Sequence, residues 1–200
     1  MSFHPRMAYD ATFHRSSRVL TETGDPFAYT ADNLSRFNLI VTRYPPERRR
    51  SAVLPALYLV QEQQGYITAA AIQYVAGLLG VTPADVEEAV FYYTMFHTRP
   101  VGTFVLRVCR TLSCALNGAE RVTEEISAAL DIKTGETDRT GTFTLLEVEC
   151  LGACDRAPVV MVNDSWQELQ QPEDVGRLLA DLRSMGEGAL TGCHHRVVSR

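Results

Sequence analysis

The chain has 200 residues, of which 46% are hydrophobic and 22% are charged, and its formal net charge is -5. This composition is typical of a globular protein with a buried core, and the length allows one domain or a domain with a sizeable appendage. The acidic balance argues against a nucleic-acid backbone as the main partner, because no face-wide surplus of Lys and Arg is available. The sequence contains no run of about 18 apolar residues, so it predicts no transmembrane helix.

Residues 1–30 show no sustained periodicity and are expected to form an irregular arm. The first 20 residues lack the apolar core of a secretory signal peptide, and an odd count of five cysteines does not suit a secreted disulfide framework. A cytoplasmic location is therefore expected. The three arginines and the single acid of this segment are also compatible with a mitochondrial transit peptide, which is the less favoured alternative.

Residues 31–98 are predicted to form a helical bundle. The apolar positions of its first helix recur at roughly helical spacing and are Leu34, Phe37, Leu39, Ile40 and Val41. This helix is expected to end before Pro45, because the residue that precedes a proline avoids the α region. A second helix is expected over residues 47–64. Pro55 lies within this second helix. Either it falls early enough to be tolerated or, as we favour, the helix is kinked or starts nearer Ser51.

Two further helices of the bundle have local start signals. Thr68 can cap a helix that Gly80 closes, because glycine adopts the left-handed C-cap conformation at little cost. Thr82-Pro83 combines an N-cap with a proline at the first helical position and opens a helix through about Phe91.

The pattern changes near residues 99–102, and residues 99–185 are predicted to form an α/β domain with the element order βαβ and then ββα. Asn163-Asp164 is the expected hairpin turn. Residues 186–200 are expected to form a C-terminal tail. The expected strands are 104–108, 143–148, 159–162 and 166–169, and the expected helices are 116–130 and 175–182.

Four of the five cysteines stand in two tight pairs, Cys109 with Cys114 and Cys150 with Cys154, and 35 residues separate the pairs. Each pair can wrap one side of an inorganic core from a single loop. Four soft thiolates form the ligand set of a [2Fe-2S] or [4Fe-4S] centre, whereas zinc ribbons usually carry C-x2-C pairs. The pairs therefore predict an iron–sulfur centre that moves single electrons.

Both pairs fall on connections between predicted elements. Cys109 ends the first strand and Cys114 precedes the next helix, while Cys150 and Cys154 lie between the second and third strands. These connections are expected to meet at one end of the sheet, with backbone N–H groups at the helix start facing the cluster sulfurs. The alternative, buried thiols or two local disulfides, suits the pairing and the reducing setting less well.

Four stretches of the sequence are distinctive in combination: LPALYLVQ at 54–61, FYYTMF at 91–96, VCRTLSC at 108–114 and VECLGAC at 148–154. In this order they resemble the 24 kDa (E) subunit of the respiratory NADH:quinone oxidoreductase, complex I, over about residues 38–185. The resemblance implies a thioredoxin-like [2Fe-2S] domain behind an N-terminal helical bundle. The implied ligands, which are also the implied metal site, are Cys109 and Cys114 on one iron and Cys150 and Cys154 on the other.

The resemblance also implies partners: the flavoprotein (F) subunit, which binds FMN and NADH, and neighbouring subunits of the peripheral arm. The chain has no G-x-G-x-x-G or P-loop, so hydride transfer would belong to the partner and this chain would have no catalytic residues of its own. As part of this translocase the chain would lie in the cytoplasm, peripheral to the inner or plasma membrane. Arg110 and Arg156 would tune the cluster potential, and Ala157-Pro158 falls where thioredoxin-like folds often place a cis proline.

Two other functions stay open at this stage. The small subunit of an NAD-linked hydrogenase or formate dehydrogenase shares the same motifs, and neighbouring genes would discriminate between these assemblies. A free thioredoxin-like ferredoxin would need little beyond the cluster domain, so the helical bundle argues against it. Cys193-His194-His195 in the tail is expected not to form a structural metal site, because the side chains of neighbouring residues diverge.

Overall fold

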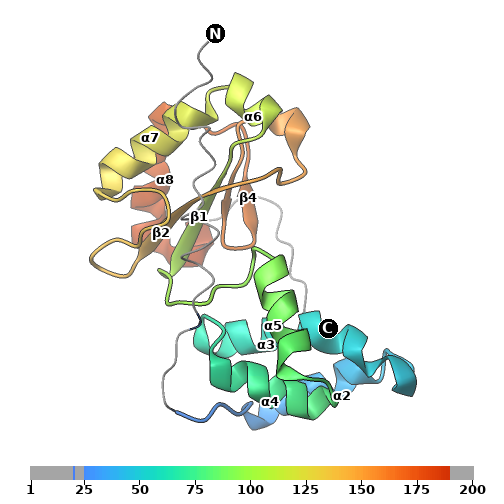
Figure 1. The fold of residues 1–200 in the computed structure, drawn as a ribbon. Helices are drawn as coiled ribbons and strands as arrows, with labels where there is room; N and C mark the ends of the chain where they lie inside the picture. The colour runs from blue at the N-terminus through green and yellow to red at the C-terminus, as the bar shows by residue number, and fades with distance from the viewer. Residues whose placement is uncertain (1–19, 21–24, 190–200) are drawn as a thin grey trace. The chain divides into compact units, whose positions relative to one another are not determined.

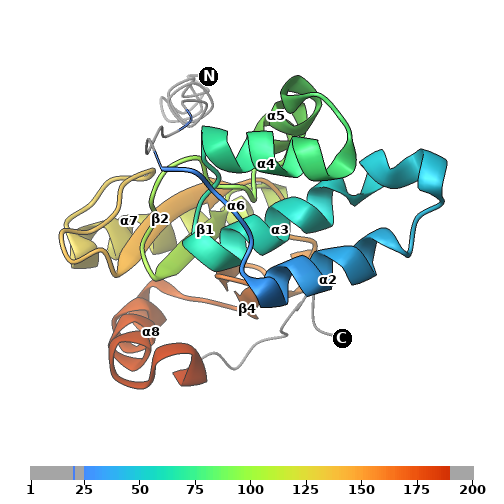
Figure 2. The same ribbon diagram turned by 90° about the horizontal axis from the view of Figure 1, so that it is seen from below.

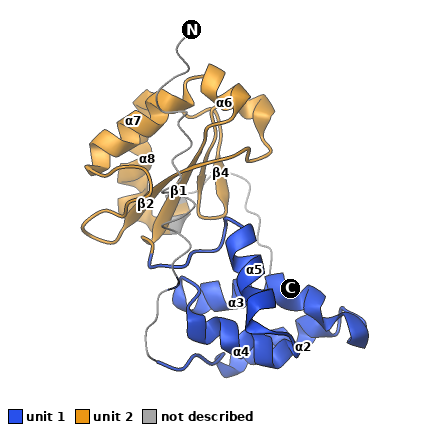
Figure 3. Cartoon of the chain, viewed as in Figure 1, with its two compact units in different colours: residues 1–100 blue, residues 101–200 orange. Residues whose placement is uncertain are grey.

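The computed structural model describes residue 20 and residues 25–189. The chain divides into two compact units, residues 1–100 and residues 101–200 (Figure 3). The first unit is helical, and the second combines a four-stranded sheet with helices (Figure 1). The predicted fold class is confirmed. Cys193-His194-His195 and most of the predicted arm lie outside the described residues.

In the helical unit, α3 packs against α2 and α4, and α4 packs against α5 (Figure 2). The buried residues of these helices are almost all apolar, so packing of their inner faces stabilises the unit. The elements are α2 (Ala31–Val41), the 3₁₀ segment η2 (Pro46–Ala52), α3 (Val53–Gln64), α4 (Ala69–Leu79) and α5 (Pro83–Tyr92).

The predicted start and stop signals of α4 and α5 are confirmed. The Thr68 hydroxyl accepts a hydrogen bond from the backbone N–H of Ala71, and Gly80 ends α4 in the left-handed conformation. At α5, Thr82 and Asp85 form a capping box, in which each side chain accepts from the backbone N–H of the other residue. These bonds satisfy donors that a helix start otherwise leaves without partners.

One detail of the helical unit follows the favoured expectation and one differs from it. The helix with Pro55 starts nearer Ser51, as one form of the favoured interpretation has it: α3 begins at Val53, which places Pro55 in the first turn, where its missing N–H costs no helical hydrogen bond. Leu39 of α2 is 59% exposed, although its spacing matched the apolar face, because α2 buries the side that carries Phe37 and Ile40.

The end of the predicted arm is packed onto the helices. Tyr29 is buried and its hydroxyl donates to the backbone carbonyl of Ala56 at 2.7 Å. Its ring lies edge-on to Tyr74, with 5.3 Å between the centroids. The Gln63 side chain also donates to the carbonyl of Ala28 and accepts from the N–H of Thr30. Residues 28–30 are therefore part of the helical unit.

Within the described residues, no single helix has both the length and the apolar composition needed to cross a membrane. The helices α4 and α5 meet that test when they are taken together, but the chain bends by 120° at the break between them.

The second unit contains a sheet with the strand order β2-β1-β3-β4. The pair β1 and β2 is parallel, whereas β1 with β3 and β3 with β4 are antiparallel. The carboxyl ends of β1 and β2 and the start of β3 therefore share one edge of the sheet. The strands are β1 (Phe104–Cys109), β2 (Phe143–Val148), β3 (Val160–Val162) and β4 (Ser165–Gln167).

One face of this sheet carries the apolar core of the second unit. Alternate residues of β1, namely Phe104, Leu106 and Val108, pack into one cluster with residues of α7 (Ala119–Leu130) and α8 (Pro172–Met185). Both helices therefore cover the same face, and they also pack against each other (Figure 1). All six residues of β1 are buried, as expected for a central strand.

The turn between β3 and β4 is the predicted one at Asn163-Asp164, with Asn163 at a positive φ of 51°. The Asn163 side chain also accepts from the N–H of Val105 at 2.9 Å and so ties the turn to β1. The Ala157-Pro158 bond, at the position where thioredoxin-like folds often place a cis proline, is cis. The helix expected over 116–130 is wrong in its first part. Gly118, at a φ of 93°, separates α7 from the short helix α6 (Leu112–Leu116).

Candidate functional site

The first cysteine pair sits where the core of the second unit ends. Cys109 is the last residue of β1, as predicted, and its N–H donates to the carbonyl of Val159 at 3.1 Å. Cys114 does not precede a helix but lies inside α6. Both residues are 2% exposed and belong to the core cluster. Their thiols are therefore held by the packing of the domain.

The second pair lies on the surface between β2 and β3. Cys150 follows the end of β2, and Cys154 opens the 3₁₀ turn η3 (Cys154–Arg156); both are exposed. Their sulfurs are 3.3 Å apart. Gly152, at a φ of 83°, turns the loop so that its N–H donates to the Cys150 sulfur at 3.4 Å. A side chain at this position would strain the backbone.

The strand arrangement brings the two pairs to the same edge of the sheet. Helix α6, which carries Cys114, packs against η3, which carries Cys154. The Arg110 N–H donates to the carbonyl of Val148, so the residues that flank the two loops are joined at 3.0 Å. The expectation that the loops meet is confirmed. The four cysteines are free thiols and form no disulfide with one another.

The electrostatics of the thiols reflect these settings. Burial raises the pKa of Cys114 to about 11, and its contacts with Cys109 act in the same direction. The Gly152 N–H lowers the pKa of Cys150, and hydrogen bonds with Cys154 and Thr111 add to this effect. The hydrogen bond and the charge of Cys150 raise the pKa of Cys154. Because the ligand of a metal is the thiolate, binding here would release protons.

Hydrogen bonds to the sulfurs come from groups that the sequence patterns did not single out. A backbone hydrogen bond from Val159 opposes the rise in the pKa of Cys114. The Thr111 hydroxyl lies 3.2 Å from the Cys109 sulfur. The expected N–H groups at a helix start after Cys114 are replaced by these donors, because α6 begins before that residue. A threonine between two cysteines is the one local signal that could have pointed to such a contact.

Both arginines that flank the cysteines form ion pairs. Arg110 bonds Glu149 at 2.8 Å, and Arg156 bonds Glu168 at 2.7 Å. Each positive charge is thus partly compensated by a carboxylate, which reduces the field it exerts on the sulfurs. The pairs also connect the second loop to its surroundings, since Glu149 precedes Cys150 and Arg156 ends η3.

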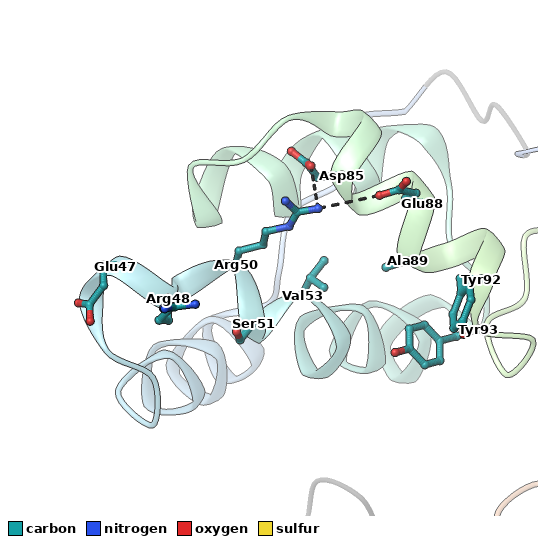
Figure 4. Close-up of a pocket in the computed structure, with 10 residues that line it drawn as sticks. All are labelled: Glu47, Arg48, Arg50, Ser51, Val53, Asp85, Glu88, Ala89, Tyr92 and Tyr93. Atoms are coloured by element: carbon teal, nitrogen blue, oxygen red, sulfur yellow. Dashed lines mark ion pairs between the residues drawn. The ribbon is translucent and has the colours of Figure 1, made fainter.

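An open groove of about 580 Å³ lies in the helical unit (Figure 4). Arg50 reaches across it to Asp85 at 3.0 Å and to Glu88 at 3.9 Å. Tyr92 and Tyr93 line its other end. None of the four described cysteines lines this groove.

The family model for thioredoxin-like [2Fe-2S] ferredoxins matches residues 37–183. The chain belongs to this family. The match includes all four paired cysteines and extends through most of the helical unit.

Relatives of the family support the resemblance drawn from the sequence. The E subunit of the NADH-quinone oxidoreductase of Rickettsia bellii is 40% identical over 159 residues, which are 79% of this chain and 95% of that protein. The E subunit of Rickettsia prowazekii is 42% identical over 73% of this chain and 83% of its own length. That of Mycobacterium tuberculosis is 39% identical over 80% of this chain and 65% of its own length. The resemblance to these proteins is confirmed.

Among solved structures, the NAD+-reducing [NiFe]-hydrogenase in the air-oxidized state superposes with a TM-score of 0.59 over 67% of this chain. Its sequence identity is 16%, and this chain spans 23% of that chain. The H2-reduced state gives a TM-score of 0.60, at 14% identity, over 25% of its chain. These likenesses show a shared fold.

Proposed function

We propose that the four cysteines hold one [2Fe-2S] cluster, with Cys109 and Cys114 on one iron and Cys150 and Cys154 on the other. The chain would act as an electron-transfer subunit of an oxidoreductase complex, in keeping with the names of its NADH-quinone oxidoreductase relatives. The observation that carries the proposal is the meeting of two free cysteine pairs at one edge of the sheet, in a member of the [2Fe-2S] ferredoxin family.

The donor set fits such a cluster. Two thiolates that share one tetrahedral metal, with bonds of about 2.3 Å, lie ~3.8 Å apart. The Cys150 and Cys154 sulfurs are 3.3 Å apart, so a small rotation would bring them to that separation. Among the described residues no group of three or more His, Cys, Asp or Glu is arranged to hold one metal ion. A two-iron centre needs two pairs rather than one convergent set.

When bound, a [2Fe-2S] cluster would accept and return one electron at a time. The chain's own residues would bury one side of it and leave the other side open. Cys109 and Cys114 would anchor the buried side through the core, and the exposed Cys150 and Cys154 would face the solvent or a partner. Arg110, Arg156 and the N–H of Gly152 would stabilise negative charge on this open side.

The proposed electron partner is a flavoprotein (F) subunit that carries FMN and NADH, together with neighbouring peripheral-arm subunits. The exposed apolar residues beside the cysteines support docking of a protein at this end. Leu112 and Leu116 of α6 are 74% and 79% exposed. Large apolar side chains exposed next to one another are typical of interaction surfaces.

We further propose that residues 31–98, with residues 28–30 packed onto them, form a docking bundle, that residues 99–185 form the cluster domain, and that the remainder of residues 1–30 and residues 186–200 are an arm and a tail. In the complex the chain would lie in the cytoplasm, peripheral to the inner or plasma membrane.

The second candidate is the corresponding subunit of an NAD-linked hydrogenase, which the superposition on the NAD+-reducing [NiFe]-hydrogenase favours. Co-purification from native cells would identify the assembly.

The cluster is tested by anaerobic expression of the whole chain with iron and sulfide. The expected product is brown, with about two irons and two acid-labile sulfides per chain, and dithionite gives an S = 1/2 signal. Zinc alone, or a cubane with four irons, would overturn the assignment. NADH should reduce the chain after the flavoprotein is added and not before, and direct reduction by NADH would reveal a nucleotide site in this chain.

A further inference from the structure

Thr111 is the N-cap residue of α6, but its side chain makes no capping hydrogen bond. Its backbone is extended as at other helix starts, with φ of -79° and ψ of 170°, and its carbonyl accepts from Ala115 in the usual way. The hydroxyl of each other threonine N-cap in the described residues accepts from a backbone N–H of the first turn; these are Thr30, Thr68 and Thr82. The side chain of Thr111 therefore has a different role.

The hydroxyl of Thr111 is directed to a sulfur of the buried cysteine pair. It lies 3.2 Å from the Cys109 sulfur. Cys109 is 2% exposed and Thr111 is half-buried, so this contact lies at the inner side of the cysteine site.

Metal ligation determines whether the sulfur or the hydroxyl donates the hydrogen bond between them. In free thiols either the sulfur or the hydroxyl can supply the hydrogen. As a metal ligand the Cys109 sulfur is a thiolate and has no proton, so the hydroxyl must donate to it. A donor to a thiolate stabilises negative charge, and it stabilises the reduced state more because that state carries one more electron.

We propose that Thr111 is a positioning residue of the redox site, whose hydroxyl donates to the Cys109 sulfur and raises the reduction potential. This inference rests on the proposed function, because it assumes that Cys109 is a ligand. It predicts that the hydroxyl, and not the methyl group, is the part of Thr111 that matters.

The test compares Thr111→Val, which keeps the shape and removes the hydroxyl, with Thr111→Ser, which keeps the hydroxyl. Thr123→Val is the matched control, because it removes a buried hydroxyl in the same unit that bonds the carbonyl of Ala119 within α7. Iron and sulfide content, and the midpoint potential from a spectroelectrochemical titration, are measured on the full-length chain and on each variant.

Thr111→Val is expected to lower the equilibrium constant for reduction about tenfold, which is about 59 mV for one electron. It should also speed the release of iron to a chelator about tenfold, as removal of an outer-shell partner commonly does. Thr111→Ser and Thr123→Val should both stay near the wild-type values.

The outcomes separate this inference from the proposed function. A wild-type chain without iron and sulfide would overturn the proposed function itself. A wild-type chain with two irons, and a Thr111→Val variant with the same potential and the same iron release, would overturn the role of Thr111 alone. If Thr111→Val cannot assemble the cluster, assembly in Thr111→Ser supports the inference, and failure in both variants shows that the hydroxyl is not the cause.

Discussion

Cys109 and Cys114 are 2% exposed and belong to the apolar core, whereas Cys150 and Cys154 are exposed in a connection on the surface. The first pair is positioned by β1 and α6, so its geometry forms when the domain folds. The second pair is positioned by a glycine turn and by contacts of exposed residues. The candidate site thus combines a core half, Cys109 and Cys114, with a surface half, Cys150 and Cys154.

The two halves of the site are stabilised by different interactions. Burial of the first pair removes sulfur from water and favours the neutral thiol, as the raised pKa of Cys114 shows. The second pair stays in contact with solvent, so its stabilisation comes from the Gly152 N–H and from surface ion pairs that water screens. The cluster-free chain should therefore keep its first pair in place, while the second pair should be the more reactive.

The largest expected effect concerns ligation of the cluster, for which all four cysteines are expected to be equally necessary. Replacement of any one of Cys109, Cys114, Cys150 or Cys154 by Ala should abolish or severely reduce the [2Fe-2S] content, because an iron that lacks a protein ligand is open to solvent. Cys193→Ala should retain about two irons and two sulfides per chain. Elemental analysis and visible absorbance measure this. Bleaching by Cys193→Ala together with full retention in Cys109→Ala would refute the ligand assignment.

The next largest effect concerns the access of a thiol reagent to the two cysteine pairs. In the folded, cluster-free chain, iodoacetamide should modify Cys150 and Cys154 at least about tenfold faster than Cys109 and Cys114, because buried thiols react through local opening. Peptide mass spectrometry of timed samples gives the four rates. In urea the difference should disappear. Equal rates in the folded chain would show that the first pair is not held by the core.

A smaller effect concerns stability without a cluster. Cys109→Ala should lower the free energy of unfolding of the second unit by about 1–2 kcal/mol, because it removes a buried sulfur and leaves a small void. Cys150→Ala should leave it unchanged. Trp166, the single tryptophan, packs against the core of this unit, so its fluorescence in a urea titration reports the right transition. The reverse order would contradict the division into a core half and a surface half.

The smallest effect concerns the ion pair of the second loop. Arg156→Gln removes the 2.7 Å contact with Glu168, and because both residues are partly exposed, the urea midpoint should hardly change. Chelator-driven release of iron should nevertheless become faster, and high salt should mimic this effect in the wild-type chain. Arg177→Gln, which breaks the surface pair with Asp174 on α8, is the matched control. A large loss of stability in Arg156→Gln alone would show that the second loop also belongs to the core.

Local sequence patterns were sufficient wherever one short segment carries the whole signal. The caps at Thr68 and Thr82, the turn at Asn163 and the strand that ends at Cys109 all appear as predicted, because each depends on the conformational preference of a few adjacent residues. The order of the elements and the positions of the cysteines also sufficed to predict the α/β domain and the meeting of the two loops, and the resemblance of four short stretches pointed to the family.

Features that depend on neighbours far along the chain became visible only in the folded structure. It exposed Leu39, whose apolar character predicted burial, because the bundle covers another side of α2. It started α6 before Cys114 and interrupted the expected long helix at Gly118. In each case packing against a distant segment overrides a local preference. Periodicity within one segment contains no information about that distant segment.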